Sequence, residues 1–214
     1  AERLELVPES DPARRVERWQ EGDLQVVGRV DPQMVSDLMQ TTGRLVVTDA
    51  PRTLFAAFNF NNPTRVDPVM LAELPLRRAL SLALDRERYA EEAWGGFLAW
   101  EQAGIVAQTW SDASRKNPKR DVERAGKLLA DANWVDLDGD GILDSPIGDS
   151  LALTTLVLDN AAPAVLDTLE AMQRDLEEVG VSLAIATLPL DQFTARWSVD
   201  RTWDLIVYDL VLFP

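Results

Sequence analysis

The sequence predicts an α/β fold, and two observations lead to this prediction. The clearer one is a strand–helix–strand succession, with apolar strands expected at 151–158 and 181–189. The helix between them ends before Gly180, and its apolar face is spaced by four and three positions: Val165, Leu169, Met172, Leu176 and Val179. A crossover of this length joins parallel strands. The second observation is a shorter helix–strand–helix–strand alternation within residues 11–48. A short helix is expected at 190–197, before a final strand.

Capping residues mark two helices at the start of the chain. A first helix is predicted from Asp11, an N-cap followed by proline, to Gly22. The segment 31–43 repeats this pattern, with its own Asp-Pro pair and final glycine. Short apolar strands are predicted after the two helices, at 24–27 and 44–48.

The middle of the chain alternates between a strand and long helices. A β-prone run at 53–62 ends in polar amides. A buried helix is predicted over 74–94, stopped and restarted at Asp85, which is a good N-cap for its second half. A further helix is predicted at 121–134, where apolar residues return at helical spacing.

The charge of the chain is unevenly distributed. The formal net charge is −15. Residues 1–130 hold 18 basic and 20 acidic residues, whereas residues 131–214 hold 3 basic and 16 acidic ones. Such an acidic surface repels nucleic acid, which argues against a nucleic-acid-binding function. The acidic half is expected to be a solvated face.

The absence of cysteine and histidine excludes several kinds of site. Without them the chain can form neither a Cys–His zinc site, nor a Cys nucleophile, nor a Ser-His-Asp triad. No apolar run reaches the roughly 18 residues of a membrane span, and no signal peptide is recognised at the start. Because the chain opens and closes in apolar strands, it is expected to be a central fragment of a longer protein.

Six stretches of the chain, in order, carry a resemblance to a known family: VERWQEGDLQVV, FAAFNFNNP, LPLRRALSLALDRERYAEEAWGG, DVERAGKLLADANWVDLDGDGILD, DTLEAMQRDLEEVGVSLAIATLPLDQFTARW and WDLIVYDL. They contain a helix that ends in an acidic turn, an Asn-bearing strand, a helix reading R-x-A-L-x-x-A-x-D-R with a glycine pair, an acidic loop after a helix, and an acidic last strand. In these features the chain resembles the extracytoplasmic solute-binding proteins of family 5, the peptide, oligopeptide and nickel receptors of ABC importers. The resemblance covers most of the chain.

The resemblance implies a fold and a division of the chain. The fold would be a lobe of the type II periplasmic-binding-protein kind, with a mixed sheet flanked by helices. Residues 1–52 would contribute part of a first lobe and the hinge region, and residues 53–214 would form a second lobe whose C-terminal part is missing.

The resemblance also implies a function. The protein would be the substrate-binding component of an ABC importer, and would capture a small solute, with a peptide as the expected one, between two lobes. It would not be an enzyme and would need no cofactor. Its partners would be the solute and the permease subunits, and it would work in the periplasm or outside the cell, held at the membrane only by the permease or a lipid anchor.

Three other functions stay open from the residues alone. The same fold serves as the sensor domain of some transcriptional regulators. A calcium-stabilised extracellular module would use the acidic loop. A carboxylate-dependent hydrolase would need two acidic side chains facing one pocket, and nothing in the spacing proposes such a pair.

Matching the family's ligand-facing segments gives four candidate binding residues. Asn59 and Asn61 match the Asn-bearing strand, and Gly95 and Gly96 match the glycine pair. The alternative for the two asparagines is a turn after the strand. The sequence departs from the family where FLAWEQAGIVAQTW replaces the usual Pro-rich turns. It departs again after the acidic strand, where the family often shows a glycine and an aromatic residue and this chain has Tyr208, Asp209 and Leu210. Because both departures fall in ligand-facing segments, the class of ligand cannot be carried over from the family.

Aromatic and acidic residues supply three further candidates. Trp110 has polar neighbours and could offer an aromatic face to a ligand, although packing is the alternative. Tyr208 and Asp209 are expected to end the last strand, where they could point into a cleft. An exposed edge is the alternative for these two residues.

The stretch DLDGDGILD is the candidate metal site. Counted as an EF-hand loop, three of its aspartates occupy ligand positions 1, 3 and 5, and a fourth occupies position 9: Asp136, Asp138, Asp140 and Asp144. Position 12, where such loops carry a bidentate glutamate, is Ile147. The sequence therefore allows a structural calcium ion of millimolar affinity, while a tight Asp/Gly turn between a helix and a strand is the alternative.

Overall fold

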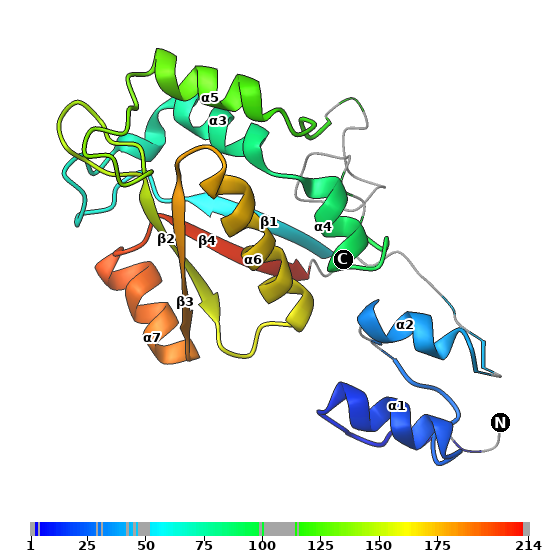
Figure 1. Cartoon of the computed structure of the whole chain (residues 1–214). Helices are drawn as coiled ribbons and strands as arrows, with labels where there is room; N and C mark the ends of the chain where they lie inside the picture. Colours follow the sequence, from blue (N-terminus) through cyan, green and yellow to red (C-terminus); the bar gives the residue numbers. More distant parts are fainter. Residues whose placement is uncertain are drawn as a thin grey trace. The chain divides into compact units, whose positions relative to one another are not determined.

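The computed structural model describes residues 5–28, 32–41, 52–98 and 116–211, together with residues 3, 30, 43, 44, 46, 100 and 114 (Figure 1). The chain divides into two compact units, Ala1–Val47 and Thr48–Pro214. Each unit is described by itself below.

The first unit contains two helices, α1 (Pro12–Gln20) and α2 (Pro32–Leu38). The side chain of Asp11 accepts hydrogen bonds from the backbone N–H groups of Ala13 and Arg14, so the predicted cap is confirmed. The ring of Trp19 lies where a Cβ on Gly43 would stand, only 2.2 Å from that position. A side chain at residue 43 would therefore collide with the indole.

The strand predicted at 24–27 is wrong. The chain is irregular there, and Val26 is 84% exposed. A run of four residues is stabilised as a strand only when it pairs with another strand, and the described part of the first unit offers none. The strand predicted at 44–48 lies mostly outside the described residues, as does the predicted cap of the second helix.

The second unit is built on a mixed four-stranded sheet, in the order β1-β4-β2-β3. The strands are β1 (Arg52–Phe58), β2 (Ala152–Leu158), β3 (Ser182–Leu188) and β4 (Leu205–Val211). Strand β2 pairs in parallel with β3 and β4, and β1 pairs antiparallel with β4. The α/β fold with a mixed sheet and the parallel strand–helix–strand unit are confirmed.

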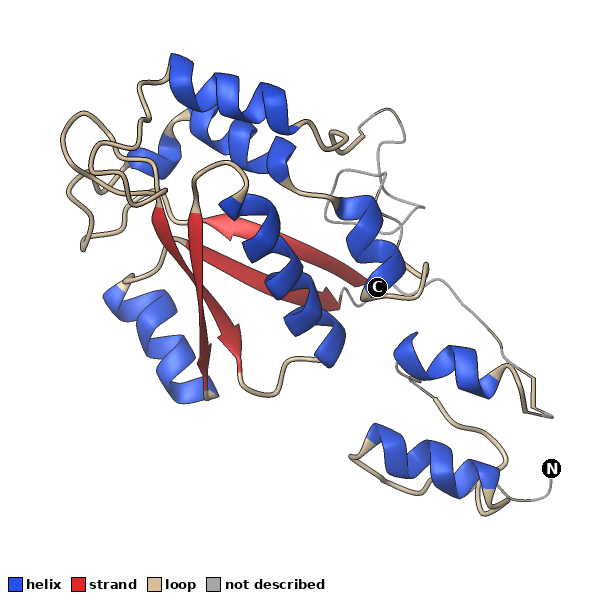
Figure 2. Ribbon diagram, viewed as in Figure 1, coloured by secondary structure: helices blue, strands red, loops and turns tan. Residues whose placement is uncertain are grey.

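Helices cover the two faces of this sheet unequally (Figure 2). One face packs against α3 (Leu74–Ala83), α4 (Arg86–Glu92), α5 (Val122–Asp131) and α6 (Pro163–Glu177), and it carries the larger core. The other packs against α7 (Leu190–Thr194), which continues as a π-helical segment over Ala195–Asp200. A short 3-10 helix over Met70–Ala72 precedes α3.

The strand directions define two edges of the sheet that are used below. The amino edge is where β2, β3 and β4 begin and β1 ends, because Phe58 pairs with Leu205. The carboxyl edge is where β2, β3 and β4 end and β1 begins, because Arg52 pairs with Val211.

Candidate functional site

The sheet places the predicted binding residues towards opposite edges. Asn59 and Asn61 directly follow β1 and so lie at the amino edge. Tyr208 is the middle residue of β4 and Asp209 is the next one towards the carboxyl edge. Because β4 runs on to Val211, the two residues do not end the last strand as predicted. These two pairs are therefore not brought together. Trp110 lies outside the described residues.

The amide of Asn59 closes the turn at the amino edge. It is 8% exposed, and its Nδ2 donates to the carbonyl oxygens of Arg201 at 2.9 Å and Trp203 at 2.8 Å. Its Oδ1 accepts from the backbone N–H of Asn61 at 3.1 Å. Both N–H groups of the Asn59 amide are thus used within the protein. Asn59 acts structurally here, and solute binding by it and by the exposed Asn61 stays a prediction.

Asp204 is the centre of the amino edge. This residue precedes β4 and is 2% exposed. Its Oδ1 accepts from Asn62 Nδ2 at 2.8 Å and from Arg65 Nε at 2.9 Å. Its Oδ2 accepts from a second guanidinium nitrogen at 2.6 Å and from the backbone N–H of Thr154 at 2.8 Å. A buried carboxylate needs such partners, and here both oxygens have two.

The guanidinium of Arg65 joins three segments at this edge. Besides the paired contact with Asp204, it donates to the carbonyl oxygens of Ser150 and Ala152 and lies 3.4 Å from the carboxylate of Asp149. Burial by itself would lower the pKa of Arg65, but the hydrogen bonds and charges of the two aspartates outweigh burial and raise it. The permanently charged guanidinium therefore links the loop after β1 to the start of β2.

Gly95 and Gly96 form the turn after α4. Both have positive φ, at 58° and 77°, a conformation that glycine adopts without strain. The turn follows Trp94, whose Nε1 donates to Thr168 Oγ1 at 3.0 Å in the first half of α6. Since α6 begins just beyond the end of β2, this contact places the glycine pair near the carboxyl edge.

Tyr208 offers an aromatic surface on the face that carries α7. It is 39% exposed, and its ring lies 6.3 Å from that of Phe55 in the neighbouring strand, at a tilt of 52°. Asp209 follows it and is half-buried. Successive residues of a strand point to opposite faces, so the Asp209 side chain lies on the other face of the sheet. The aromatic pair by itself suits apolar and cationic groups.

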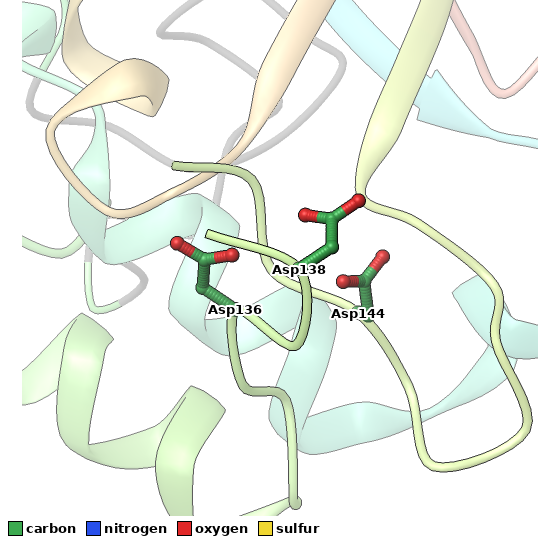
Figure 3. Close-up of side chains that lie close together, drawn as sticks. All are labelled: Asp136, Asp138 and Asp144. Carbon is green, nitrogen blue, oxygen red and sulfur yellow. The ribbon is translucent and has the colours of Figure 1, made fainter. Parts of the chain in front are cut away.

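Three of the four aspartates of the acidic loop lie close together (Figure 3). Carboxylate oxygens of Asp136, Asp138 and Asp144 lie within 4.8 Å of one another, and Asp140 is not in this group. The carboxylate of Asp136 also accepts from the backbone N–H groups of Gly139 at 2.7 Å and Gly141 at 3.1 Å. These hydrogen bonds are those of the tight Asp/Gly turn, and the calcium ion stays a prediction.

The sequence analysis did not identify the buried charges that organise the second unit. Arg65, Asp204 and Asp175 are the principal ones, and Asp175 in α6 is 1% exposed. One signal was available: a lone aspartate between apolar residues, as in WDLIV, must be buried with partners or lie on an exposed side. The partners themselves are up to 142 residues away in the chain, so the sequence could not name them.

Comparison with known proteins identifies the family. The sequence profile described as bacterial extracellular solute-binding proteins, family 5 Middle, matches residues 2–212. A probable ABC transporter-binding protein of Deinococcus radiodurans is 22% identical over 163 residues, which cover 73% of this chain and 27% of that protein.

Solved structures show the same fold. The oligopeptide-binding protein AppA of Bacillus subtilis, in complex with a nonapeptide, matches 95% of this chain with a TM-score of 0.73 and 21% identity. NikA of Brucella suis, in complex with Fe(III)-EDTA, matches 94% with a TM-score of 0.77 and 19% identity. A Thermotoga maritima oligopeptide-binding protein with bound mannohexaose matches 75% with a TM-score of 0.61 and 20% identity.

The chain spans 40% of the length of AppA and of NikA. Among the described residues, none of the helices combines the length and the apolar character that crossing a membrane requires. The mixed sheet with helices on both faces, its likeness to type II periplasmic binding proteins, and the match over residues 2–212 lead to one conclusion: the chain belongs to family 5 of the bacterial extracellular solute-binding proteins.

Proposed function

We propose that the whole protein is the substrate-binding component of an ABC importer and that its solute is a peptide. The observation that carries this proposal is the family match, which runs almost from end to end of the chain. The nonapeptide bound by AppA supports the choice of a peptide among the solutes of the relatives. The family is one of transport receptors, so the function is reversible capture, with no covalent chemistry.

The solute would be bound at the carboxyl edge of the sheet. Ligands of open α/β sheets bind beyond the carboxyl ends of the parallel strands. Gly95 and Gly96 would bring backbone close to the solute, and Tyr208 and Asp209 would contribute a ring and a charge. Trp110 completes the proposed set. Asn59 and Asn61 lie at the other edge and would act through the stability of the lobe.

The mechanism would be the closing of two lobes around the solute. Residues 53–214 would be one lobe, and residues 1–52 would belong to the other lobe and the hinge. A solute that contacts both lobes binds the closed form more tightly than the open one, and this difference in affinity shifts the population towards closure. The closed receptor would then deliver its solute to the permease subunits.

The protein would work outside the cytoplasmic membrane, as the family does, and a lipid anchor on the whole protein would keep it there. A transcriptional sensor would instead be cytoplasmic and joined to a DNA-binding domain. The comparisons support neither this alternative nor a calcium-stabilised module.

The experiment is a thermal-shift screen of the full-length protein against short peptides, nickel chelates and oligosaccharides. A ligand at a hundred times its dissociation constant adds about 2.7 kcal/mol to the free energy of unfolding, which a melting curve detects. We expect a shift with peptides. A shift only with nickel chelates or only with oligosaccharides would support a transport receptor with that solute in place of a peptide. No shift with any class would contradict the proposal. The 214-residue chain alone should not bind peptides at micromolar affinity, because it spans 40% of the length of AppA and of NikA and would supply little of the second lobe that closes on the solute.

A further inference from the structure

Helix α4, which leads into the Gly95–Gly96 turn, is held against α6 at both of its ends. The two contacts come from Asp175 and Thr168, which are seven residues apart in α6. Seven residues are close to two helical turns, so both side chains lie on the same side of α6, about 10 Å apart along its axis. The later residue of α6 meets the start of α4 and the earlier one meets its end. The two helices therefore run antiparallel.

Asp175 holds the start of α4. Its Oδ2 accepts from the backbone N–H of Asp85, the N-cap residue of α4, at 2.8 Å. It also accepts from the hydroxyl of Tyr89, and its Oδ1 pairs with the guanidinium of Arg88. Burial, and then the hydrogen bond to this carboxylate, raise the pKa of Tyr89 above its ordinary value.

Arg120, which lies outside α4, also pairs with Asp175, the residue that holds the start of that helix. Nε of Arg120 donates to the carbonyl oxygen of Ala83 at 3.0 Å, and its Nη2 lies 2.8 Å from Glu178 and 3.7 Å from Asp175. The end of α3, the start of α4 and the end of α6 are thus joined through one buried carboxylate. Ion pairs connect Asp175 directly or through an arginine with four charged residues: Asp85, Arg88, Arg120 and Glu178.

Thr168 holds the residue that follows α4. Trp94 Nε1 donates to Thr168 Oγ1 at 3.0 Å, and this hydroxyl donates in turn to the carbonyl oxygen of Ala164 at 2.6 Å. Trp94 is 8% exposed and Thr168 is 3% exposed. Gly95 follows Trp94 directly, so nothing flexible separates this contact from the glycine turn. The backbone N–H of Gly96 donates to Ala90 at 2.8 Å, which returns the turn to α4.

We propose that Thr168 and Asp175 are positioning residues that set where the Gly95–Gly96 turn stands, and through it the geometry of the solute site. The proposal rests on the function proposed above for that turn. Sliding α4 along α6 would leave a buried carboxylate, a hydroxyl and an indole N–H without partners at once. Because each unpartnered buried polar group is costly, α4 has one favoured register and not a continuous range.

The test compares three single variants of the full-length protein. Thr168→Val removes the contact nearest the turn and keeps the shape of the side chain. Asp175→Asn removes the charge at the other end. Thr155→Val is the matched control: Thr155 is a fully buried threonine of the same core face, and its Oγ1 has no hydrogen-bond partner within the described part of the chain.

The first readout is amide hydrogen exchange, which needs no ligand. Thr168→Val should speed exchange at Gly96 by about tenfold, the size expected for the loss of one buried hydrogen bond, and leave the amide of Thr154 at the amino edge unchanged. Thr155→Val should change neither amide. Equal acceleration at both amides, or none at Gly96, would overturn the proposal. If Asp175→Asn fails to fold, the comparison of Thr168→Val with Thr155→Val still tests whether the contact with Trp94 positions the turn.

The second readout is affinity for a pool of random nonapeptides, measured by calorimetry. We expect Thr168→Val to weaken binding by about tenfold and Thr155→Val to leave it within about twofold. An unchanged affinity in Thr168→Val, with faster exchange at Gly96, would show that the turn moves without serving the site and would overturn the link to binding. Absence of binding by the wild-type protein would count against the proposed peptide function. The exchange data alone would then test whether Thr168 positions the Gly95–Gly96 turn.

Discussion

At the amino edge of the sheet, four hydrogen bonds end on the carboxylate of Asp204. Further along the strands the partly exposed ring of Tyr208 stands midway in β4, and a turn of two glycines lies near the carboxyl edge. The first arrangement fastens three chain segments, and both oxygens of its buried carboxylate accept two hydrogen bonds each. The second presents a polar and aromatic surface. The difference indicates that one edge serves the stability of the lobe and the other its binding of solute.

The largest effect is expected from Asp204→Ala. The change leaves Arg65 largely buried without its main partner, which should lower the free energy of unfolding by about 3–5 kcal/mol. Urea denaturation followed by circular dichroism measures this. The control is Asp159→Ala, which removes an exposed carboxylate at the carboxyl end of β2 and should cost under about 0.5 kcal/mol. Similar losses in the two variants would contradict the contrast between the edges.

Gly180→Ala should come next. Gly180 follows α6 at the amino edge with φ at 74°, and a Cβ there would lie 2.7 Å from Cγ of Leu143. Strain and collision together should cost about 1–3 kcal/mol. Gly96→Ala at the other edge has a similar φ of 77°, but it meets only the flexible Glu91 side chain at 3.4 Å, so its cost should be smaller. Thermal melts of both variants test the order, and a larger loss at Gly96 would reverse it.

The pH dependence of stability tests the contact between Tyr89 and Asp175. Since the pKa of Tyr89 is raised in the folded protein, its contribution is fully present below the unfolded value of 10.0 and is lost as pH rises above it. Above pH 10 the free energy of unfolding should therefore fall with rising pH, by up to about 1.4 kcal/mol per pH unit. Denaturation at several alkaline pH values should give a flatter curve for Tyr89→Phe. Tyr208→Phe, which changes the chain's other tyrosine, should keep the wild-type slope.

The smallest effect is expected at the acidic loop. Calcium at ten times a millimolar dissociation constant would add about 1.4 kcal/mol to the free energy of unfolding, reversed by EDTA. Asp138→Asn should abolish this gain. Asp140→Asn, which changes the aspartate outside the three-carboxylate group, should keep most of it. A melting temperature that calcium leaves unchanged would assign the loop to its turn alone.

Local patterns predicted most of the second unit. The parallel unit of β2, α6 and β3 followed from apolar spacing and a final glycine, and Asp85 caps α4 as its residue type indicates. The strand predicted at 24–27 failed because pairing with another strand, and not propensity, decides whether a short apolar run becomes a strand. The helix predicted at 190–197 runs on as a π-helical segment to Asp200, where Arg201 takes the left-handed conformation. No local signal marks that extension.

The candidate site was less accessible to sequence reasoning. The family resemblance pointed to Asn59 as a ligand-binding amide, yet its two donors are taken by carbonyl groups 142 and 144 residues further along the chain. Asp175 belongs to the acidic half that was expected to be a solvated face, but it is buried and its partners lie 86, 87 and 90 residues away. A buried charge is decided by tertiary packing, which a single sequence does not show.

The pairing of Arg52 with Val211 has a consequence for protein engineering. The segment that runs from β1 to β4 starts and finishes on neighbouring strands, so its two ends are side by side. A linker of a few residues could join them, and new termini could then be opened in an exposed loop elsewhere. The segment from Arg52 to Val211 could therefore be circularised, or inserted into a host protein at one position.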